Sequence, residues 1–263
     1  MFSSPGDIAF YILSIPVYYY GLIMAISLLS GVTLASFIAG RFYSDVNPEV
    51  IYDIAPHVII GAIIGARIYY CLLSYQYFGK NPIEIFQIWH GGISIHGGII
   101  GGLIAGVIYA KRHKLPVLKL CDIFSYGLIL GQAIGRWGNF FNSEAFGTPT
   151  DNFLKLYIPI YKRPLEYMQY NYFHPTFLYE SILDLCIFLI MFFIIRKHTK
   201  GVDGLVFFSY LILYSNARII VEQVRIDSVA SVFGMPVAIF ASVLIILISI
   251  IALFVIRLRN ENQ

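Results

Sequence analysis

The segment best suited to chemistry runs from Gly135 to Gly147 and reads GRWGNFFNSEAFG. It places Arg136 where an apolar segment ends, and three polar side chains follow: Asn139, Asn142 and Glu144. A guanidinium group has five N–H donors and suits phosphate or carboxylate oxygens, while a side-chain amide both donates and accepts. The two amides are equally suited to holding a polar ligand, to bracing the arginine, and to capping a turn in an ordered loop.

A second arginine lies among polar neighbours in the segment 214–222, YSNARIIVE. Tyr214, Arg218 and Glu222 are four residues apart, so they lie on one helix face and can hydrogen-bond in sequence. A purely structural ion pair with Arg218 would explain the presence of Glu222 at this position equally well. The arginine would still keep donors for a ligand. Arg136 and Arg218 facing one cavity would repel each other unless an anion lay between them, and phosphate is the natural candidate.

A histidine within an apolar segment is the third candidate. His96 belongs to the segment 90–98, HGGISIHGG, and an imidazole is a suitable general base near neutral pH. The alternative is a histidine that only hydrogen-bonds across helices. Glycines follow it at small-xxx-small spacings, which are more typical of close helix packing than of catalysis. They are Gly97, Gly98, Gly101, Gly102 and Gly106.

The elements that must position these residues are predicted to be membrane-spanning helices. Of the 263 residues, 58% are hydrophobic and 13% are charged, and a water-soluble fold of this length would lack enough polar surface. The chain is predicted to be an all-α, polytopic membrane protein, a single domain over 1–263 with a larger external segment at about 137–174. Seven apolar runs are long enough to cross about 30 Å of hydrocarbon. They are 18–39, 50–73, 93–111, 118–136, 175–195, 203–222 and 236–256.

The distribution of basic residues predicts the orientation of these helices. Alternate connections hold ten Lys and Arg in one set and five in the other. The larger set is Arg41, Lys111, Arg112, Lys114, Lys119, Arg196, Lys197, Lys200, Arg257 and Arg259; the smaller is Lys80, Lys155, Lys162, Arg163 and Arg225. The amino terminus is therefore expected outside and the carboxyl terminus in the cytoplasm. The first sixteen residues carry no Lys or Arg, so the first helix is expected to be retained. The net charge of +3 is then a topology signal and not a sign of nucleic-acid binding.

Polar side chains are expected to gather in the outer half of the membrane. In this orientation Arg67, Arg136 and Arg218 lie near the outer ends of outward-running helices. The inward-running helices bring further polar groups to the same side: Tyr20, His96, His174 and Glu180. A charge inside a bilayer is expensive, so it normally faces a cavity or a partner. Glu180 is expected to pair with one of the three arginines, whereas Arg67 could also reach the interface by snorkelling.

These polar segments together resemble the prolipoprotein diacylglyceryl transferases of bacteria. GRWGNFFNSEAFG is similar to the signature of that family, and further matches follow in order over most of the chain, from Tyr19 to Glu222. They are YYGL at 19–22, GARIYY at 65–70, GGISIHGG at 91–98, HPTFLYE at 174–180 and YSNARIIVE at 214–222.

The resemblance implies an enzyme of the bacterial cytoplasmic (inner) membrane, with its active site toward the outer leaflet. A diacylglyceryl group would move from phosphatidylglycerol to the thiol of a lipobox cysteine in a prolipoprotein signal peptide, releasing glycerol 1-phosphate. Membrane lipid and prolipoproteins are the implied partners, and the reaction needs neither a cofactor nor a metal. The reacting thiol belongs to the substrate, which fits a chain whose own cysteines, Cys71, Cys121 and Cys186, have no activating neighbours in the sequence.

The resemblance and the residue chemistry together suggest a role for each polar side chain. By family analogy, His96 is the candidate base that forms the substrate thiolate, because a thiol with a pKa of about 8.5 is mostly protonated at neutral pH. Arg136 and Arg218 are expected to stabilise negative charge on the leaving phosphate. The residues expected to bind or position substrate are Tyr20, Arg67, Asn139, Asn142, Glu144, Gly147, Glu180, Tyr214 and Glu222.

A transporter or receptor for an anionic solute is the main alternative. The same arginines would then bind and release a ligand without chemistry. Transporters usually need polar groups toward both faces of the membrane, or broken helices near its midplane. Here the inner halves of the helices are almost entirely apolar, so the sequence favours an enzyme. The exceptions are Asp53, His57, Asp122 and Asp184.

Overall fold

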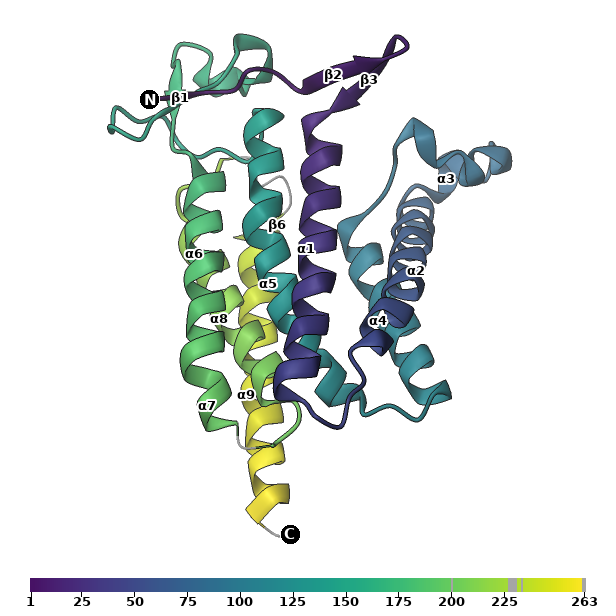
Figure 1. Ribbon diagram of the computed structural model, residues 1–263. Helices are drawn as coiled ribbons and strands as arrows, with labels where there is room; N and C mark the ends of the chain where they lie inside the picture. Colours follow the sequence, from purple (N-terminus) through teal and green to yellow (C-terminus); the bar gives the residue numbers. More distant parts are fainter. Residues whose placement is uncertain (200, 227–230, 233, 262–263) are drawn as a thin grey trace. The chain divides into compact units, whose positions relative to one another are not determined.

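The computed structural model describes residues 1–199, 201–226, 231–232 and 234–261, and it is mostly helical (Figure 1). Six helices in these ranges are long and apolar enough to cross a membrane. They are α1 (Tyr19–Phe42), α2 (Glu49–Leu73), α5 (Val117–Phe141), the continuous stretch Thr176–His198, α8 (Leu205–Glu222) and α9 (Val237–Glu261). The stretch Thr176–His198 comprises α6 (Thr176–Ile190), a π-helical turn (Met191–Ile195) and α7 (Arg196–His198).

The predicted run 93–111 forms a helix of its own, α4 (Ile95–Arg112). Within the described ranges it is not among the six, because its glycines and the terminal Lys111 and Arg112 lower its mean hydropathy. Shorter helices lie between α2 and α4 and in the segment after α5. They are α3 (Tyr75–Phe78) and the 3-10 helices η1 (Pro82–Phe86), η2 (Ile88–His90), η3 (Ile160–Lys162) and η4 (Leu165–Tyr167).

Short strands, which the all-α prediction did not include, lie outside the long helices. They are β1 (Phe2–Ser3), β2 (Ile8–Ile12), β3 (Ile15–Tyr18), β4 (Leu156–Tyr157), β5 (Tyr172–Phe173), β6 (Ser231–Val232) and β7 (Met235–Pro236). β4 pairs with β1 in parallel and with β5 antiparallel, whereas β2–β3 and β6–β7 are hairpins. A small apolar core orders the segment around β4 and β5, and its buried members are Phe146, Leu156, Ile158, Phe173 and Phe177.

Helix α5 continues past the predicted end at residue 136 to Phe141. The segment that follows, predicted to be external from about residue 137, therefore begins only after Phe141. Aromatic packing explains the extension, because Phe140 lies 5.1 Å from Phe177 and Phe141 stacks on Tyr19 at 4.2 Å between ring centroids. As a result Arg136 and Asn139 both lie on helix α5 and not in a loop that follows it.

The internal contacts divide the chain into two compact units, Met1–Ala35 with Cys121–Gln263, and Ser36–Leu120. The single domain over 1–263 stays a prediction. Within the second unit, the glycines of α2 and α4 bring the two backbones into direct contact. A Cβ atom on Gly65 would lie 2.4 Å from the carbonyl oxygen of Gly97, and one on Gly101 would lie 2.2 Å from that of Gly61. The small-xxx-small spacings in α4 therefore serve close helix packing.

In the first unit, α1 and α5 approach in the same way, because a Cβ atom on Gly127 would lie 2.3 Å from the carbonyl oxygen of Gly31. Asp122 on α5 holds the start of α8. Its two carboxylate oxygens accept hydrogen bonds from the backbone N–H groups of Gly204 and Phe207, each at 2.7 Å. These contacts fix the helices that carry the polar side chains.

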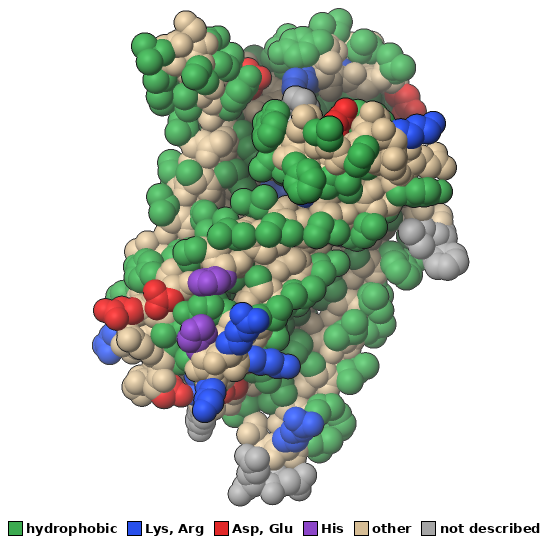
Figure 2. Space-filling view, turned by 90° about the vertical axis from the view of Figure 1, so that its right-hand side faces the viewer, with side chains coloured by type: hydrophobic (Ala, Val, Ile, Leu, Met, Phe, Trp, Pro, Cys, Tyr) green, Lys and Arg blue, Asp and Glu red, His purple; other side chains and the backbone are tan. Residues whose placement is uncertain are grey.

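Hydrophobic side chains cover much of the visible surface in Figure 2. Large aliphatic residues on three different helices are mostly exposed, with exposed fractions of 68% for Leu72, 64% for Ile99 and 63% for Ile251. A helix surface of this composition is suited to lipid and not to water.

Candidate active site

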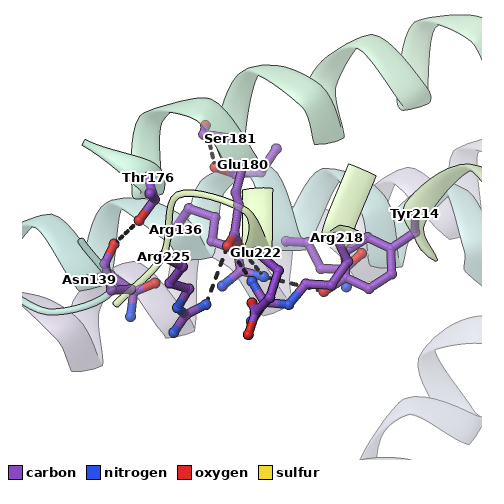
Figure 3. A network of polar contacts seen from close by, with 12 residues as sticks. Arg136, Asn139, Thr176, Glu180, Ser181, Tyr214, Arg218, Glu222 and Arg225 are labelled. Carbon is purple, nitrogen blue, oxygen red and sulfur yellow. Dashed lines mark hydrogen bonds and ion pairs between the residues drawn. The ribbon is translucent and has the colours of Figure 1, made fainter. Parts of the chain in front are cut away.

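Glu180 on α6 is buried among arginines from other segments of the chain (Figure 3). Its Oε2 lies 2.5 Å from Nη2 of Arg136 on α5. Its Oε1 accepts a hydrogen bond from Nη1 of Arg218 on α8 at 2.7 Å. The predicted pairing of Glu180 with one of the intramembrane arginines is confirmed, and it pairs with two of them.

Arg225, just beyond the end of α8, brings a third guanidinium group to the same carboxylate. Its Nη1 donates to Oε1 of Glu180 at 3.3 Å. The sequence pattern assigned Arg225 only to a loop, so this contact was not predicted. Helical spacing could not have revealed this contact, because α8 ends at Glu222 and Arg225 reaches Glu180 from the chain beyond it.

Glu222 and Tyr214 occupy the helix face that their spacing predicts. Oε2 of Glu222 lies 2.7 Å from Nη2 of Arg218, which confirms the expected ion pair four residues apart. The hydroxyl of Tyr214 accepts a hydrogen bond from Nη2 of Arg136 at 3.3 Å. Tyr214 thus contacts the arginine of α5, whereas the sequence predicted a hydrogen bond to Arg218. Arg136 and Arg218 are each held by two groups.

The carboxylates of this cluster are buried more deeply than the arginines. The exposed fraction of the side chain is 6% for Glu180 and 1% for Glu222, against 20% for Arg136 and 17% for Arg218. An unpaired buried carboxylate costs several kcal/mol, so the ion pairs strongly favour fixed positions for the guanidinium groups. The sequence suggested a phosphate as the anion between Arg136 and Arg218, and in the structure the carboxylate of Glu180 contacts both of them. A phosphate could reach the exposed edges of the same guanidinium groups.

The polar residues after Arg136 brace a tight loop. Asn139 and Asn142 both donate through Nδ2 to Oε1 of Glu144, at 3.0 and 3.4 Å. Ser143 and Ala145 have positive φ angles of 50° and 55°, a conformation that non-glycine residues rarely adopt. The sequence allowed these two amides to hold a ligand, to brace the arginine or to cap a turn. The structure shows them ordering the loop through Glu144.

Gly147 ends this loop at a place where a side chain has no room. Its N–H donates to the carbonyl oxygen of His174 at 2.9 Å, and its backbone forms a bridge with Arg225. A Cβ atom here would lie 2.6 Å from the carbonyl oxygen of Val224 and 3.0 Å from Cγ2 of Thr176. The absence of a side chain at Gly147 therefore lets the loop pair with the chain that carries Arg225.

Tyr20 lies in the first turn of α1 and packs on α5 at another glycine. A Cβ atom on Gly138 would lie 2.9 Å from Cδ2 of the Tyr20 ring. Gly138, which belongs to the GRWGNFFNSEAFG segment, thus leaves space for the Tyr20 ring. Arg136 and Asn139 lie within two residues of this glycine in the sequence. A role for the Tyr20 hydroxyl in holding substrate stays a prediction.

Arg67 and His96 belong to the other compact unit. Arg67 is buried, with an exposed fraction of 6%, and its guanidinium donates to backbone carbonyl groups between Glu84 and Gly92. His96 is the second residue of α4 and is exposed, with its ring centroid 6.2 Å from that of Tyr69. An exposed imidazole at a helix start can meet a substrate thiol. Binding of substrate by Arg67 stays a prediction.

Comparison with known proteins identifies the family. The model of the family described as "Prolipoprotein diacylglyceryl transferase" matches residues 7–255. The chain belongs to this family. A relative from Synechococcus elongatus, named phosphatidylglycerol–prolipoprotein diacylglyceryl transferase, is 47% identical over 86% of the chain and 79% of its own length. Relatives of the same name from Nostoc sp. and Prochlorococcus marinus are 46% and 40% identical, over 87% and 98% of the chain and 81% and 95% of their own lengths.

In this diacylglyceryl transferase the structure brings most of the predicted site residues of the first unit into two connected groups. The first is the arginine–glutamate cluster, comprising Arg136, Glu180, Tyr214, Arg218 and Glu222, to which Arg225 is added. The second is the segment 139–147, which begins in the last turn of α5 and continues into the loop that pairs with the backbone at Val224 and Arg225. The family model that matches residues 7–255 and the relatives of the same name confirm the family resemblance inferred from the motifs.

Proposed function

We propose that this chain transfers the diacylglyceryl group of phosphatidylglycerol to the thiol of a lipobox cysteine in a prolipoprotein signal peptide. The products are a thioether-linked lipoprotein precursor and glycerol 1-phosphate, and the reaction is the first step of bacterial lipoprotein maturation. The names of the relatives support the choice of substrates. The observation that carries the proposal is the buried cluster of Arg136, Arg218 and Arg225 around Glu180.

The proposed reaction is a displacement at a glycerol carbon. The thiolate sulfur of the substrate cysteine forms a bond to this carbon as the bond from the carbon to the phosphate oxygen breaks. The leaving glycerol 1-phosphate gains negative charge, and Arg136 and Arg218 stabilise it with donors that are already in place. His96 accepts the thiol proton, which increases the thiolate fraction at neutral pH. Neither a metal nor a cofactor is required.

The remaining site residues hold substrates or hold the arginines. Asn139 and Asn142 orient the phosphatidylglycerol head group, and Glu144 keeps both amides in position. Glu180 and Glu222 fix the guanidinium groups through the ion pairs seen in the cluster. Gly147 and the hydroxyl groups of Tyr20 and Tyr214 complete the proposed substrate-binding set, whereas the donors of Arg67 are occupied by backbone carbonyl groups.

In the proposed topology seven helices span the bacterial inner membrane, and α4 is the seventh. The amino terminus lies outside and the carboxyl terminus lies in the cytoplasm, as the ten basic residues on alternate connections indicate. The cluster then faces the outer leaflet, where signal peptides emerge after translocation. Single cysteines at Lys155 and Arg259, introduced after Cys71, Cys121 and Cys186 are replaced, test this orientation. Only the cysteine at 155 should react with an impermeant thiol reagent in intact cells.

Purified protein, phosphatidylglycerol labelled in its acyl chains and a lipobox peptide provide the test of activity. We expect a labelled thioether product, and we expect none with a peptide in which serine replaces the lipobox cysteine. If Arg136→Ala and His96→Ala both kept the wild-type rate, the assigned roles would be wrong. If the protein formed no product with any anionic phospholipid and instead took up an anionic solute in vesicles, the transporter alternative would replace the enzyme.

A further inference from the structure

The guanidinium group of Arg67 uses every one of its donors on the backbone of one segment. Nε donates to the carbonyl oxygen of Ile85 at 2.9 Å, and Nη1 donates to those of Gly91 and Gly92 at 2.6 and 2.8 Å. Nη2 donates to the carbonyl oxygens of Glu84 and Gln87. Guanidinium has five N–H bonds, so the donors and acceptors match in number. A ligand could bind Arg67 only by displacing one of these carbonyl groups.

The segment needs such a partner because its own backbone does not form a long helix. η1 and η2 are 3-10 helices of five and three residues, which leave carbonyl groups at their ends without helical partners. Gly91 and Gly92 then have φ angles of +84° and +76°. Two successive residues in this left-handed region direct their carbonyl groups to the same nitrogen of Arg67, and glycine adopts that conformation at the lowest cost.

The surroundings of Arg67 leave no room for a different arrangement at Gly92. A Cβ atom there would lie 2.6 Å from Cε1 of Tyr70 and 2.8 Å from Nη1 of Arg67. The ring of Phe78 covers the guanidinium group, with its centroid 5.1 Å from Cζ. Arg67 is thus enclosed by aromatic rings as well as by carbonyl groups, as expected of a structural anchor.

The anchored segment leads directly to His96. Two residues after Gly92, the N–H of Ser94 donates to the carbonyl oxygen of Ala66 at 3.0 Å, and α4 begins at the next residue. Arg67 and its neighbour Ala66 therefore hold the chain at Gly91, Gly92 and Ser94, immediately before the turn of helix that carries His96.

We propose that Arg67 is a positioning residue, which fixes the segment Glu84–Ser94 on α2 and thereby places His96 at the start of α4. The proposal rests on the proposed function, in which His96 accepts the proton of the substrate thiol. In this proposal the GARIYY and GGISIHGG motifs together position His96. Lysine cannot replace Arg67 here, because an ammonium group has three donors and no planar fork.

The test compares Arg67→Lys with the control Arg112→Lys, which changes an exposed arginine at the end of α4. Hydrogen exchange of the backbone amides is measured by mass spectrometry, and kcat and KM for phosphatidylglycerol are measured with a lipobox peptide. We expect Arg67→Lys to accelerate exchange over residues 84–96 by about tenfold or more. We expect kcat to fall by about tenfold or more while KM changes by less than about twofold, because His96 is misplaced and the lipid is still bound.

Wild-type exchange together with wild-type kcat in Arg67→Lys would overturn the proposal. A raised KM without faster exchange would also overturn it, and would instead make Arg67 a direct ligand of the lipid. If Arg67→Lys does not fold, Gly92→Ala provides the same readouts, since it keeps the arginine but places a Cβ atom against Tyr70 and Nη1 of Arg67 and strains the backbone that carries one acceptor. A wild-type protein that forms no thioether would contradict the proposed function, whereas the exchange measurement would still report on the anchor.

Discussion

Oε2 of Glu180 lies 2.5 Å from Nη2 of Arg136, and both side chains are largely buried among membrane-spanning helices. This pair joins α5 to α6, and the other oxygen of the same carboxylate joins α6 to α8 through Arg218. One glutamate therefore sets the separation of the two arginines that are proposed to receive the phosphate. The geometry of the site depends on Glu180 more than on any single arginine.

Glu180→Gln should show this dependence. The amide keeps the size of the side chain and removes its charge, so the buried guanidinium groups lose their shared partner. Breaking a buried ion pair costs about 3–5 kcal/mol, and we expect a clearly lower unfolding midpoint in detergent together with a rate of transfer reduced by about 100-fold. Asp151→Asn, which breaks the exposed pair with Lys155, is the control and should leave both unchanged. Equal effects of the two substitutions would contradict the central role of Glu180.

Gly147→Ala should act through Arg225. The new Cβ atom would lie 2.6 Å from the carbonyl oxygen of Val224, so the loop and the chain at Arg225 must separate. We expect transfer activity to fall by about tenfold, and Arg225→Lys to add less in the double variant than it does alone. Gly135→Ala, whose Cβ atom would make an ordinary 3.6 Å contact with Oγ of Ser27, is the control. Strictly additive effects would show that the two residues act independently.

Gly101→Ala should destabilise the packing of α2 on α4. A Cβ atom at this position would lie 2.2 Å from the backbone oxygen of Gly61, and neither backbone can move without the rest of its helix. We expect a loss of about 1–3 kcal/mol in the free energy of unfolding. Gly98→Ala on the same helix would approach only to 3.6 Å of the Ala62 oxygen and should cost much less. Matching unfolding midpoints for the two variants would refute close backbone contact at Gly101.

Asp45, in the connection between α1 and α2, should give the stability a dependence on acid pH. A hydrogen bond from Lys119 lowers the pKa of this carboxyl group below its ordinary value of 3.8. The pair therefore contributes fully above pH 3.8 and its contribution is lost as the pH falls through the lowered pKa. Asp45→Asn should lower the unfolding midpoint slightly near pH 6 and have no effect at strongly acid pH. High salt should reduce the difference, because 58% of the Asp45 side chain is exposed.

The long helices could be predicted from the sequence because apolar runs of about 20 residues are typical of membrane-spanning helices. The end of α5 could not, since Phe140 and Phe141 extend the helix through contacts with Phe177 and Tyr19. Tertiary contacts of this kind have no counterpart in a hydropathy pattern. The strands of two residues were missed for a similar reason, because so short a strand has no recognisable periodicity; β2 and β3, of five and four residues, were not predicted either.

The site could be predicted where the partners are charged side chains. A charged residue in an apolar run needs a partner of opposite charge, so the position of Glu180 predicted a contact with an arginine. The spacing of Arg218 and Glu222 predicted the contact between these two residues. Arg225 was assigned to a loop because it follows the apolar run, and it reaches Glu180 from beyond the end of α8, where helical spacing no longer applies. The partners of Arg67 could not be predicted, because they are backbone carbonyl groups, which leave no trace in the residue types.

The order of the cluster along the chain has a consequence for biosynthesis. Arg136 and Glu180 are both synthesised before Arg218 and Arg225, so the pair they form is the first that can neutralise charge inside the bilayer. Helix α8 then brings Arg218 to a carboxylate that already has one partner, and it brings Glu222 as a second counter-charge of its own. Helices α6 and α8 can therefore each enter the membrane with a neutralising group at hand, and the complete cluster exists only after the ribosome has passed residue 225.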